Sequence, residues 1–263
     1  VFVMTPPVFA VLSVLPYCLL RRVPFVMDAH TAAFLHPRWK HWQWLQRWLS
    51  RRAATTIVTN EHLANLVRQG GGHATIVRDV PVEYPPAPPF PLNGKFAIAA
   101  VCSFNYDEPV EEIFKAAEKL ENVEFYVTGN TRDLSPEIAA RAPGNVRFTG
   151  FLPDPDYGSL LKTAQAVLTL TTRDHTMLRG AYEAIYLGTP VIISDWPILR
   201  EAFPRGAVYV DNTMESIVRA VREMAANQAK LQQQALALRK QKLAEWKKTK
   251  AAILQRIRTQ QNP

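Results

Sequence analysis

Short apolar runs rich in β-branched residues alternate with helix-like stretches along most of the sequence. The runs at 96–101 and 123–128, for example, enclose a helical pattern at 109–120. Strands that are apolar throughout are typical of parallel sheets covered by helices. The pattern therefore predicts an α/β fold and excludes coiled-coil, all-β and membrane-spanning architectures. The predicted strands are 1–4, 24–27, 55–59, 74–77, 96–101, 123–128, 146–148, 166–170, 191–193 and 208–210, and the predicted helices are 38–52, 60–69, 109–120, 155–164, 176–187 and 197–203.

A proline-rich segment at 81–94 interrupts this alternation. Six of its residues are proline, which lacks an N–H group and cannot join a helix interior or a central strand. We interpret the segment as an extended linker between a first domain at 1–80 and a second at 95–225. The first domain holds few βα units and opens on Val1 inside a predicted strand, so we expect it to be incomplete at its amino end.

A helical tail at 226–263 follows, and we expect it to pack back on the first domain. Asn212 or Thr213 is the predicted cap of the helical region that leads into it. One apolar stripe recurs at helical spacing and should be buried. It comprises Leu236, Leu243, Trp246, Ile253 and Ile257.

The net charge of +8 is unevenly distributed. Residues 1–94 carry nine basic and four acidic side chains, residues 95–225 carry thirteen and eighteen, and residues 226–263 carry nine and one. A basic face across the whole body, typical of nucleic-acid binding, is absent from this pattern, so we expect no nucleic-acid partner. The two basic parts suit an anionic membrane surface, or packing around the acidic domain.

Only two cysteines are present, which excludes a disulfide scaffold and fits a reducing compartment. The longest apolar run, at 8–20, contains Pro16 and is too short to span a bilayer. We therefore expect a cytoplasmic protein, with a peripheral position on the inner face of the cytoplasmic membrane left open. The familiar phosphate-loop, zinc-site and nucleophile-elbow motifs are absent from the sequence, so no metal site and no cofactor is expected.

The strongest indication of a binding site lies at 166–195. A strand there runs into a polar loop, and the helix pattern at 176–187 follows and is closed by Gly188 and then Pro190. Ligands bind at the carboxyl edge of a parallel sheet, and the positive amino end of a helix favours phosphate. The candidate phosphate ligands are Arg173, Thr176 and Arg179.

The string RGAYEAIYLGTPVIISD, which starts at Arg179, resembles the donor-binding segment of GT-B nucleotide-sugar glycosyltransferases of the family-four-like, group-one kind. The resemblance covers 96–211 well and 5–81 more loosely. In that family two glutamates eight positions apart flank this helix start, and the second holds the ribose hydroxyls of the nucleotide. Glu183 matches the second glutamate, whereas His175 stands at the position of the first, which normally contacts the donor sugar or its phosphate.

The resemblance implies two Rossmann-like domains, a long C-terminal helix, and transfer of a sugar from a nucleotide-diphosphate donor to a saccharide or lipid-linked acceptor. A metal-independent reaction in bacterial surface-polysaccharide or glycolipid synthesis is the expected setting. Two alternatives stay open, a nucleotide-sugar 2-epimerase on the same fold and a non-catalytic nucleotide-sugar or membrane-binding module. Two features keep the second alternative open, His175 in place of glutamate and the expected incomplete amino end of the first domain.

A simpler interpretation makes Glu183 a surface partner of Arg179, one helical turn away, and His175 a loop residue that caps the helix. The strand–loop–helix context favours ligand binding for Glu183 and decides nothing for His175. The predicted donor site has further candidate residues. Each of them either contacts the phosphate, sugar or base of the donor or is an ordinary turn residue. They are Ser103 and Asn105, after the strand at 96–101, and Phe151, after the strand at 146–148.

In the first domain, His30 follows the predicted strand at 24–27. The glycosyltransferase family that the sequence resembles often has a histidine at this place, near the reacting sugar. His30 is therefore a catalytic candidate, with Asp28 orienting it, although a lone histidine is also common as a structural residue.

Residues 38–52 hold four of the six tryptophans. On a helical wheel, basic side chains lie opposite a broad apolar face, which suits a membrane interface or a lipid-linked acceptor. An ordinary helix packed on the sheet is the alternative, and base-stacking is disfavoured by the acidic second domain. The candidate contact residues are Trp42, Trp44, Trp48, Arg47 and Arg51.

Overall fold

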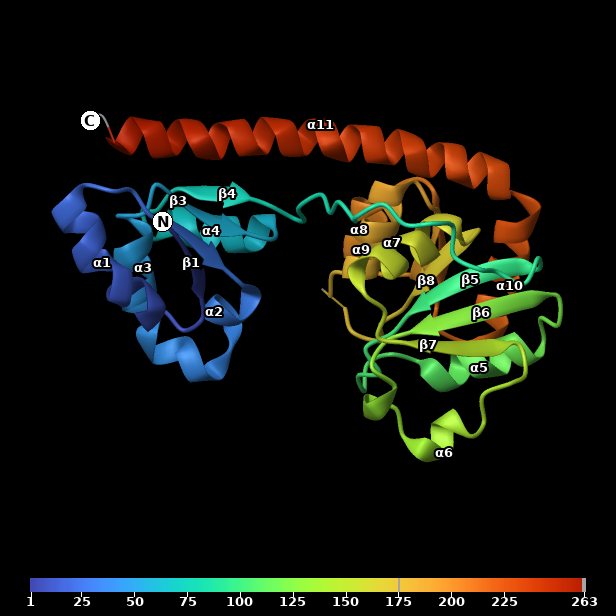
Figure 1. The fold of residues 1–263 in the computed structure, drawn as a ribbon. Helices are drawn as coiled ribbons and strands as arrows, with labels where there is room; N and C mark the ends of the chain where they lie inside the picture. Colours follow the sequence, from blue (N-terminus) through green and yellow to red (C-terminus); the bar gives the residue numbers. More distant parts are fainter. Residues whose placement is uncertain (175, 262–263) are drawn as a thin grey trace. The chain divides into compact units, whose positions relative to one another are not determined.

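The computed structural model describes residues 1–174 and 176–261 and divides the chain into two compact units. The first unit comprises residues 1–80 together with the tail from Leu243, and the second comprises 81–242. Each unit is built on a parallel sheet with helices packed against it (Figure 1). The predicted α/β fold is therefore confirmed, and the ten predicted strands are all present.

The first unit holds a four-stranded parallel sheet in the order β1-β2-β3-β4. Each crossover leads to the neighbouring strand, and buried side chains such as Met27, Leu49 and Leu63 join strands to helices. The elements of this unit before the tail are β1 (Phe2–Thr5), α1 (Phe9–Arg21), β2 (Val26–Ala29), α2 (Thr31–Leu35), the 3₁₀ helix η1 (Pro37–Trp42), α3 (Gln43–Ser50), β3 (Thr55–Val58), α4 (Glu61–Gln69) and β4 (Ala74–Ile76).

Two helices of the first unit differ from expectation. The apolar run at 8–20 was not predicted as a helix, yet it forms α1, which buries Val11, Leu15 and Cys18 and contains Pro16 in its interior. Its apolar residues surround the helix, so no polar stripe marks the helical period. The helix predicted at 38–52 is confirmed only for α3, because the residues before Gln43 form the 3₁₀ helix η1 instead of an α-helix.

The second unit holds a six-stranded parallel sheet in the order β10-β9-β8-β5-β6-β7. From β5 the chain moves outward through β6 and β7 and then returns to β8 on the other side of β5. This reversal is the switch point at which ligands bind in such sheets. The elements that build the unit before its C-terminal helices are β5 (Phe96–Val101), α5 (Val110–Glu118), β6 (Val123–Thr128), η2 (Thr131–Asp133), α6 (Pro136–Ala139), β7 (Val146–Gly150), α7 (Asp154–Thr163), β8 (Ala166–Thr169), α8 (Arg179–Leu187), β9 (Val191–Ser194), α9 (Pro197–Ala202) and β10 (Ala207–Val210).

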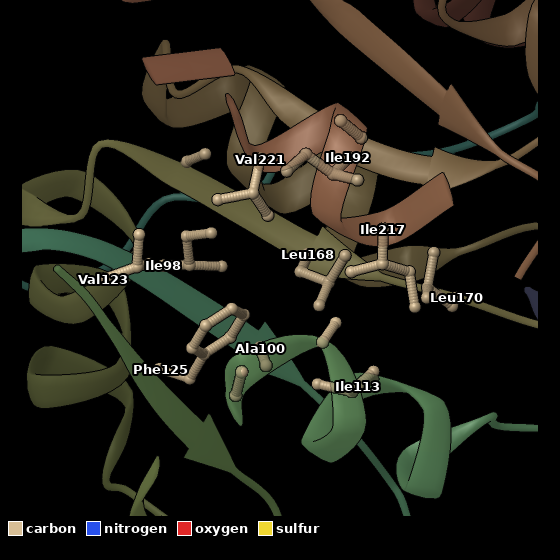
Figure 2. Packing of buried hydrophobic residues seen from close by; sticks show 14 of the residues in the cluster. Ile98, Ala100, Ile113, Val123, Phe125, Leu168, Leu170, Ile192, Ile217 and Val221 are labelled. Atoms are coloured by element: carbon tan, nitrogen blue, oxygen red, sulfur yellow. The ribbon is translucent and has the colours of Figure 1, made fainter. Parts of the chain in front are cut away.

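Both faces of this sheet are covered, as strands that are apolar throughout require. Figure 2 shows Ile98, Phe125 and Leu168 of the strands meeting Ile113 of α5 and Ile217 of the C-terminal region. A second cluster lies on the opposite face, where α7, α8 and α9 pack. The two clusters hold β5 and β8 side by side and so fix the geometry of the switch point.

The C-terminal region forms two helices, α10 (Met214–Ala226) and α11 (Gln228–Gln261). The Thr213 side chain caps α10 by accepting a hydrogen bond from the Ser216 N–H at 3.3 Å, which confirms one of the two predicted caps. The predicted stripe is wrong for Leu236 and Leu243, which are exposed. The side of α11 that is buried in the second unit instead carries Leu231, Ala235 and Leu238.

Candidate functional site

A cavity of about 620 Å³ lies at the carboxyl ends of β5 and β8, at the switch point of the second unit. Its walls come from the loop after β5, the loop after β8, the first turns of α7 and α8, and the proline-rich segment. Cavities of this size with a few convergent polar groups are where small ligands bind in open α/β sheets.

The helix that borders the cavity begins later than predicted. α8 starts at Arg179 rather than at residue 176, because Leu178 is extended and acts as a cap without a side-chain hydrogen bond. Gly180 lets the first turn lie against β5, since a Cβ at this position would be 3.1 Å from the Val101 side chain. Gly188 ends the helix in the left-handed conformation, as predicted. The amino end of α8 is therefore at the cavity.

The Glu183 carboxylate is buried against this cavity, with 5% of the residue exposed. The Tyr157 hydroxyl donates a hydrogen bond to Oε2 at 2.6 Å, and Arg179 Nε donates one to Oε1 at 2.8 Å. Burying a carboxylate is costly unless it is paired and hydrogen-bonded. These donors therefore hold an acceptor group at the cavity wall. The ion pair with Arg179 is present, but Glu183 does not occupy the surface position of the simpler interpretation.

The loop after β5 already contains an anion. The Ser103 N–H donates hydrogen bonds to both carboxylate oxygens of Glu108, at 3.0 and 2.8 Å. Burial raises the pKa of Glu108, and hydrogen bonds from the backbone at Ser103, Phe104 and Asn105 act in the opposite direction. Phe104 has a positive φ of 56°, a conformation that turns successive N–H groups toward one anion. The Glu108 carboxylate therefore occupies the position in this loop where a phosphate of a ligand would otherwise bind.

Most of the predicted donor-site residues are brought together by the fold. Those that line the cavity are Ser103, Asn105, Phe151, Thr176, Arg179 and Glu183. Arg173 is exposed and does not line it, and His175 lies outside the described residues.

The catalytic candidates His30 and Asp28 lie in the first unit, at the end of β2. In the part of the chain that the structure describes, no cluster of three or more His, Cys, Asp or Glu side chains is placed to hold a metal ion.

The cavity also contains polar side chains that sequence reasoning did not propose as site residues, among them Tyr84, Glu108 and Tyr157. Tyr84 is an aromatic residue within a proline-rich segment. That unusual position is the feature of the sequence that could have identified it as a cavity residue. Glu108 and Tyr157 lie near the starts of α5 and α7, where acidic and polar residues are common for local reasons. Their spacing from Glu183 in the sequence gives no indication that they share a site with it.

The tryptophan-rich segment of the first unit is partly exposed. Trp44 is 63% exposed, and Trp42 and Trp48 are also exposed. Arg51 Nε donates a hydrogen bond to the Gly70 carbonyl at 2.6 Å, so its guanidinium is held by the protein itself. Arg47 lines a separate cavity of about 380 Å³. Among the helices of residues 1–174 and 176–261, none combines the length and apolar character that a membrane span requires.

Comparison with known proteins adds a family match. The sequence model of a family described as glycosyl transferase-like matches residues 108–254, which include Glu108, Tyr157, Arg179 and Glu183. No curated protein matches the chain by sequence.

Solved structures share the fold at low sequence identity. Sucrose-phosphate synthase from Thermosynechococcus elongatus has a TM-score of 0.61 at 15% identity, over 91% of this chain and 68% of that one. Anabaena HepE, solved in complex with UDP-glucose, has a TM-score of 0.64 at 15% identity, over 97% and 78%. A putative UDP-N-acetylglucosamine 2-epimerase from Listeria monocytogenes has a TM-score of 0.59 at 13% identity, over 90% and 68%.

Proposed function

The chain belongs to the glycosyl transferase-like family, and on that premise we propose that it transfers a sugar from a nucleotide-diphosphate donor to a saccharide or lipid-linked acceptor. One observation carries the proposal. A buried carboxylate, Glu183, lies at a cavity at the switch point of the second sheet, beside the amino end of α8. The complex of HepE with UDP-glucose supports a nucleotide sugar as the donor.

In this proposal Glu183 accepts a hydrogen bond from the ribose of the donor. The diphosphate lies toward the amino end of α8, where the helix dipole and the Arg179 guanidinium provide positive charge. Negative charge builds up on the departing diphosphate in the transition state, so preorganised positive groups lower the barrier. Because these groups can supply that charge, we propose a metal-independent reaction.

Other roles are proposed on the resemblance alone. Thr176, Ser103, Asn105 and Phe151 would contact the donor, and Arg173 would add a phosphate contact from the exposed loop after β8. The first unit would provide His30 and Asp28 near the reacting sugar, and His175 would take the position of the missing glutamate. The proposed setting is surface-polysaccharide or glycolipid synthesis at the inner face of the cytoplasmic membrane.

Donor turnover is the direct test of this function. The protein is incubated with UDP-, GDP- and ADP-sugars, with and without lipid-linked saccharides, and the released nucleoside diphosphate is measured. Acceptor-dependent release supports the transferase. Interconversion of UDP-N-acetylhexosamines without an acceptor would instead support the epimerase, whose fold this chain shares. Tight binding without turnover in any mixture would favour the non-catalytic module.

Replacement of Glu108 by glutamine should strengthen binding of the nucleoside diphosphate about three- to tenfold at neutral pH. The carboxylate lines the cavity and repels phosphate by on the order of 1 kcal/mol. Since burial raises the pKa of Glu108, the wild-type affinity should rise as the pH falls through that pKa, and the variant should lose this dependence. Calorimetric titrations at several pH values measure both effects, with exposed Glu118→Gln as control. Equal pH profiles would contradict the prediction.

Replacement of Trp44 by alanine should weaken binding to anionic vesicles roughly tenfold, because an exposed indole is lost from the interface. Cosedimentation with phosphatidylglycerol vesicles measures the effect. The difference from binding to phosphatidylcholine vesicles gives the electrostatic contribution to binding. The control is Tyr106→Ala, which removes an exposed ring from the second unit. Identical cosedimentation of the two variants would contradict a membrane role for the tryptophans.

A further inference from the structure

A second cavity, of about 380 Å³, lies in the first unit and is lined by side chains of α2, α3 and α4. None of its lining residues belongs to the donor cavity of the second unit. Phe34, Leu66 and Val67 form an apolar part of its wall, and no aspartate or glutamate of the described residues lines it. Pockets for small ligands begin at about 300 Å³, so this cavity has room for a sugar.

One side chain of this wall, Gln46, is buried with an unpaired amide. Only 2% of the residue is exposed, and neither Nε2 nor Oε1 has a hydrogen-bond partner among the residues that the structure describes. Burying a polar group without a partner is costly, and nearly all buried polar groups in folded proteins are paired. An apolar side chain of the same size would avoid this cost. The amide therefore points to a partner that the chain itself does not provide.

Two further side chains of α3 add an acceptor and a positive charge to the same wall. Gln43 Nε2 donates to the carbonyl oxygens of Ala33 at 2.7 Å and Trp39 at 3.1 Å, so its own carbonyl oxygen is left as an acceptor. Arg47 takes part in none of the ion pairs among the described residues. Its stem lies close to Gly70, where a Cβ would be 3.1 Å from Arg47 Cγ. The guanidinium is therefore positioned at the cavity and available to an anion.

We propose that this cavity binds a saccharide that carries an anionic group, either a carboxylate or a phosphate. A sugar hydroxyl both donates and accepts hydrogen bonds, so neighbouring hydroxyls satisfy the donor and the acceptor of the Gln46 amide. The Arg47 guanidinium forms paired hydrogen bonds with the oxygens of the anionic group. The apolar part of the wall covers one face of the sugar ring. This site belongs to the first unit, and its ligand binds independently of the donor proposed for the second.

The test is titration of the full chain with glucuronate, galacturonate and glucose 6-phosphate, followed by NMR of the ligand, with glucose as the neutral control. At least one anionic sugar should bind about tenfold or more tightly than glucose, because hydrogen bonds between charged groups are the stronger ones. Preference for a uronate assigns the carboxylate as the anionic group, and preference for glucose 6-phosphate assigns the phosphate. Affinities equal to that of glucose, or no binding of any anionic sugar, would overturn the proposal.

Gln46→Met separates a ligand-binding role from a structural one. Methionine is of similar size and has no amide to leave unpaired, so this variant should melt at a higher temperature than the wild type and bind the anionic sugar about tenfold more weakly. Arg47→Gln should lower that affinity to the level of glucose. Lys40→Gln removes an exposed charge of the same unit outside the cavity and should match the wild type.

Two results with these variants would overturn the site. One is a Gln46→Met protein that melts at a lower temperature than the wild type, because the amide would then have a structural partner. The other is an affinity for the anionic sugar that Gln46→Met and Arg47→Gln leave at the level of Lys40→Gln.

Discussion

Glu183→Gln should weaken binding of the donor nucleotide by about ten- to a hundredfold, while the protein stays folded. A hydrogen bond from a ribose hydroxyl to a carboxylate is worth about 1.5–3 kcal/mol, roughly twice a neutral one. The amide keeps the size of the side chain but loses its charge. It also offers a poorer acceptor to Tyr157 and Arg179, so it is held less firmly. Calorimetric titration with nucleoside diphosphates measures the loss.

The matched control is Glu118→Gln, an exposed glutamate in α5 that does not line the cavity. It removes the same charge from the same unit, so general electrostatic effects are shared by the two variants. Circular dichroism checks that both variants fold. Nucleotide affinities of Glu183→Gln that equal those of Glu118→Gln would remove Glu183 from the binding site.

Gly129→Ala should destabilise the second unit by about 3 kcal/mol or more. Gly129 follows β6 with a φ of +151°, and a Cβ there would be 2.0 Å from the Cys102 carbonyl oxygen. The obstacle is backbone at the end of β5, so relief requires movement of the strand end that leads into the cavity. Strained backbone positions cost about 1–3 kcal/mol each, and overlap with a neighbouring strand adds to this.

Urea unfolding followed by fluorescence measures the free energy of unfolding for this variant. Gly144→Ala is the control, because no atom lies within 4 Å of the Cβ that it adds. The control should differ from the wild type by less than about 0.5 kcal/mol, the usual range for surface substitutions. A Gly129→Ala protein as stable as the control would contradict the close packing of β5 on β6.

The strands could be predicted from the sequence because burial on both faces makes their entire length apolar. The runs at 96–101 and 123–128 agree with β5 and β6 to the residue. The α8 region was recognisable for a related reason, since Gly188 and Pro190 mark the end of the helix. Its start was placed three residues early, because Leu178, and not a polar capping residue, precedes the first turn.

Features that depend on contacts between distant residues could not be predicted. α1 lacks a polar stripe, so its period is invisible until the sheet that buries Val11 and Leu15 is known. Glu183 was identified as a site residue, but its donor Tyr157 lies far away in the sequence. The approach of Tyr84 to α7 depends on Gly158, and a lone glycine in a helix does not reveal which side chain it admits.

The central claim is that this protein releases a nucleoside diphosphate from a sugar donor bound at Glu183. The most direct measurement is the rate of that release across UDP-, GDP- and ADP-sugars, with a lipid-linked saccharide present, for the wild type and Glu183→Gln. We expect release from at least one donor by the wild type and a rate at least tenfold lower for Glu183→Gln at subsaturating donor. Equal rates for the two proteins, or no release from any donor, would contradict the claim.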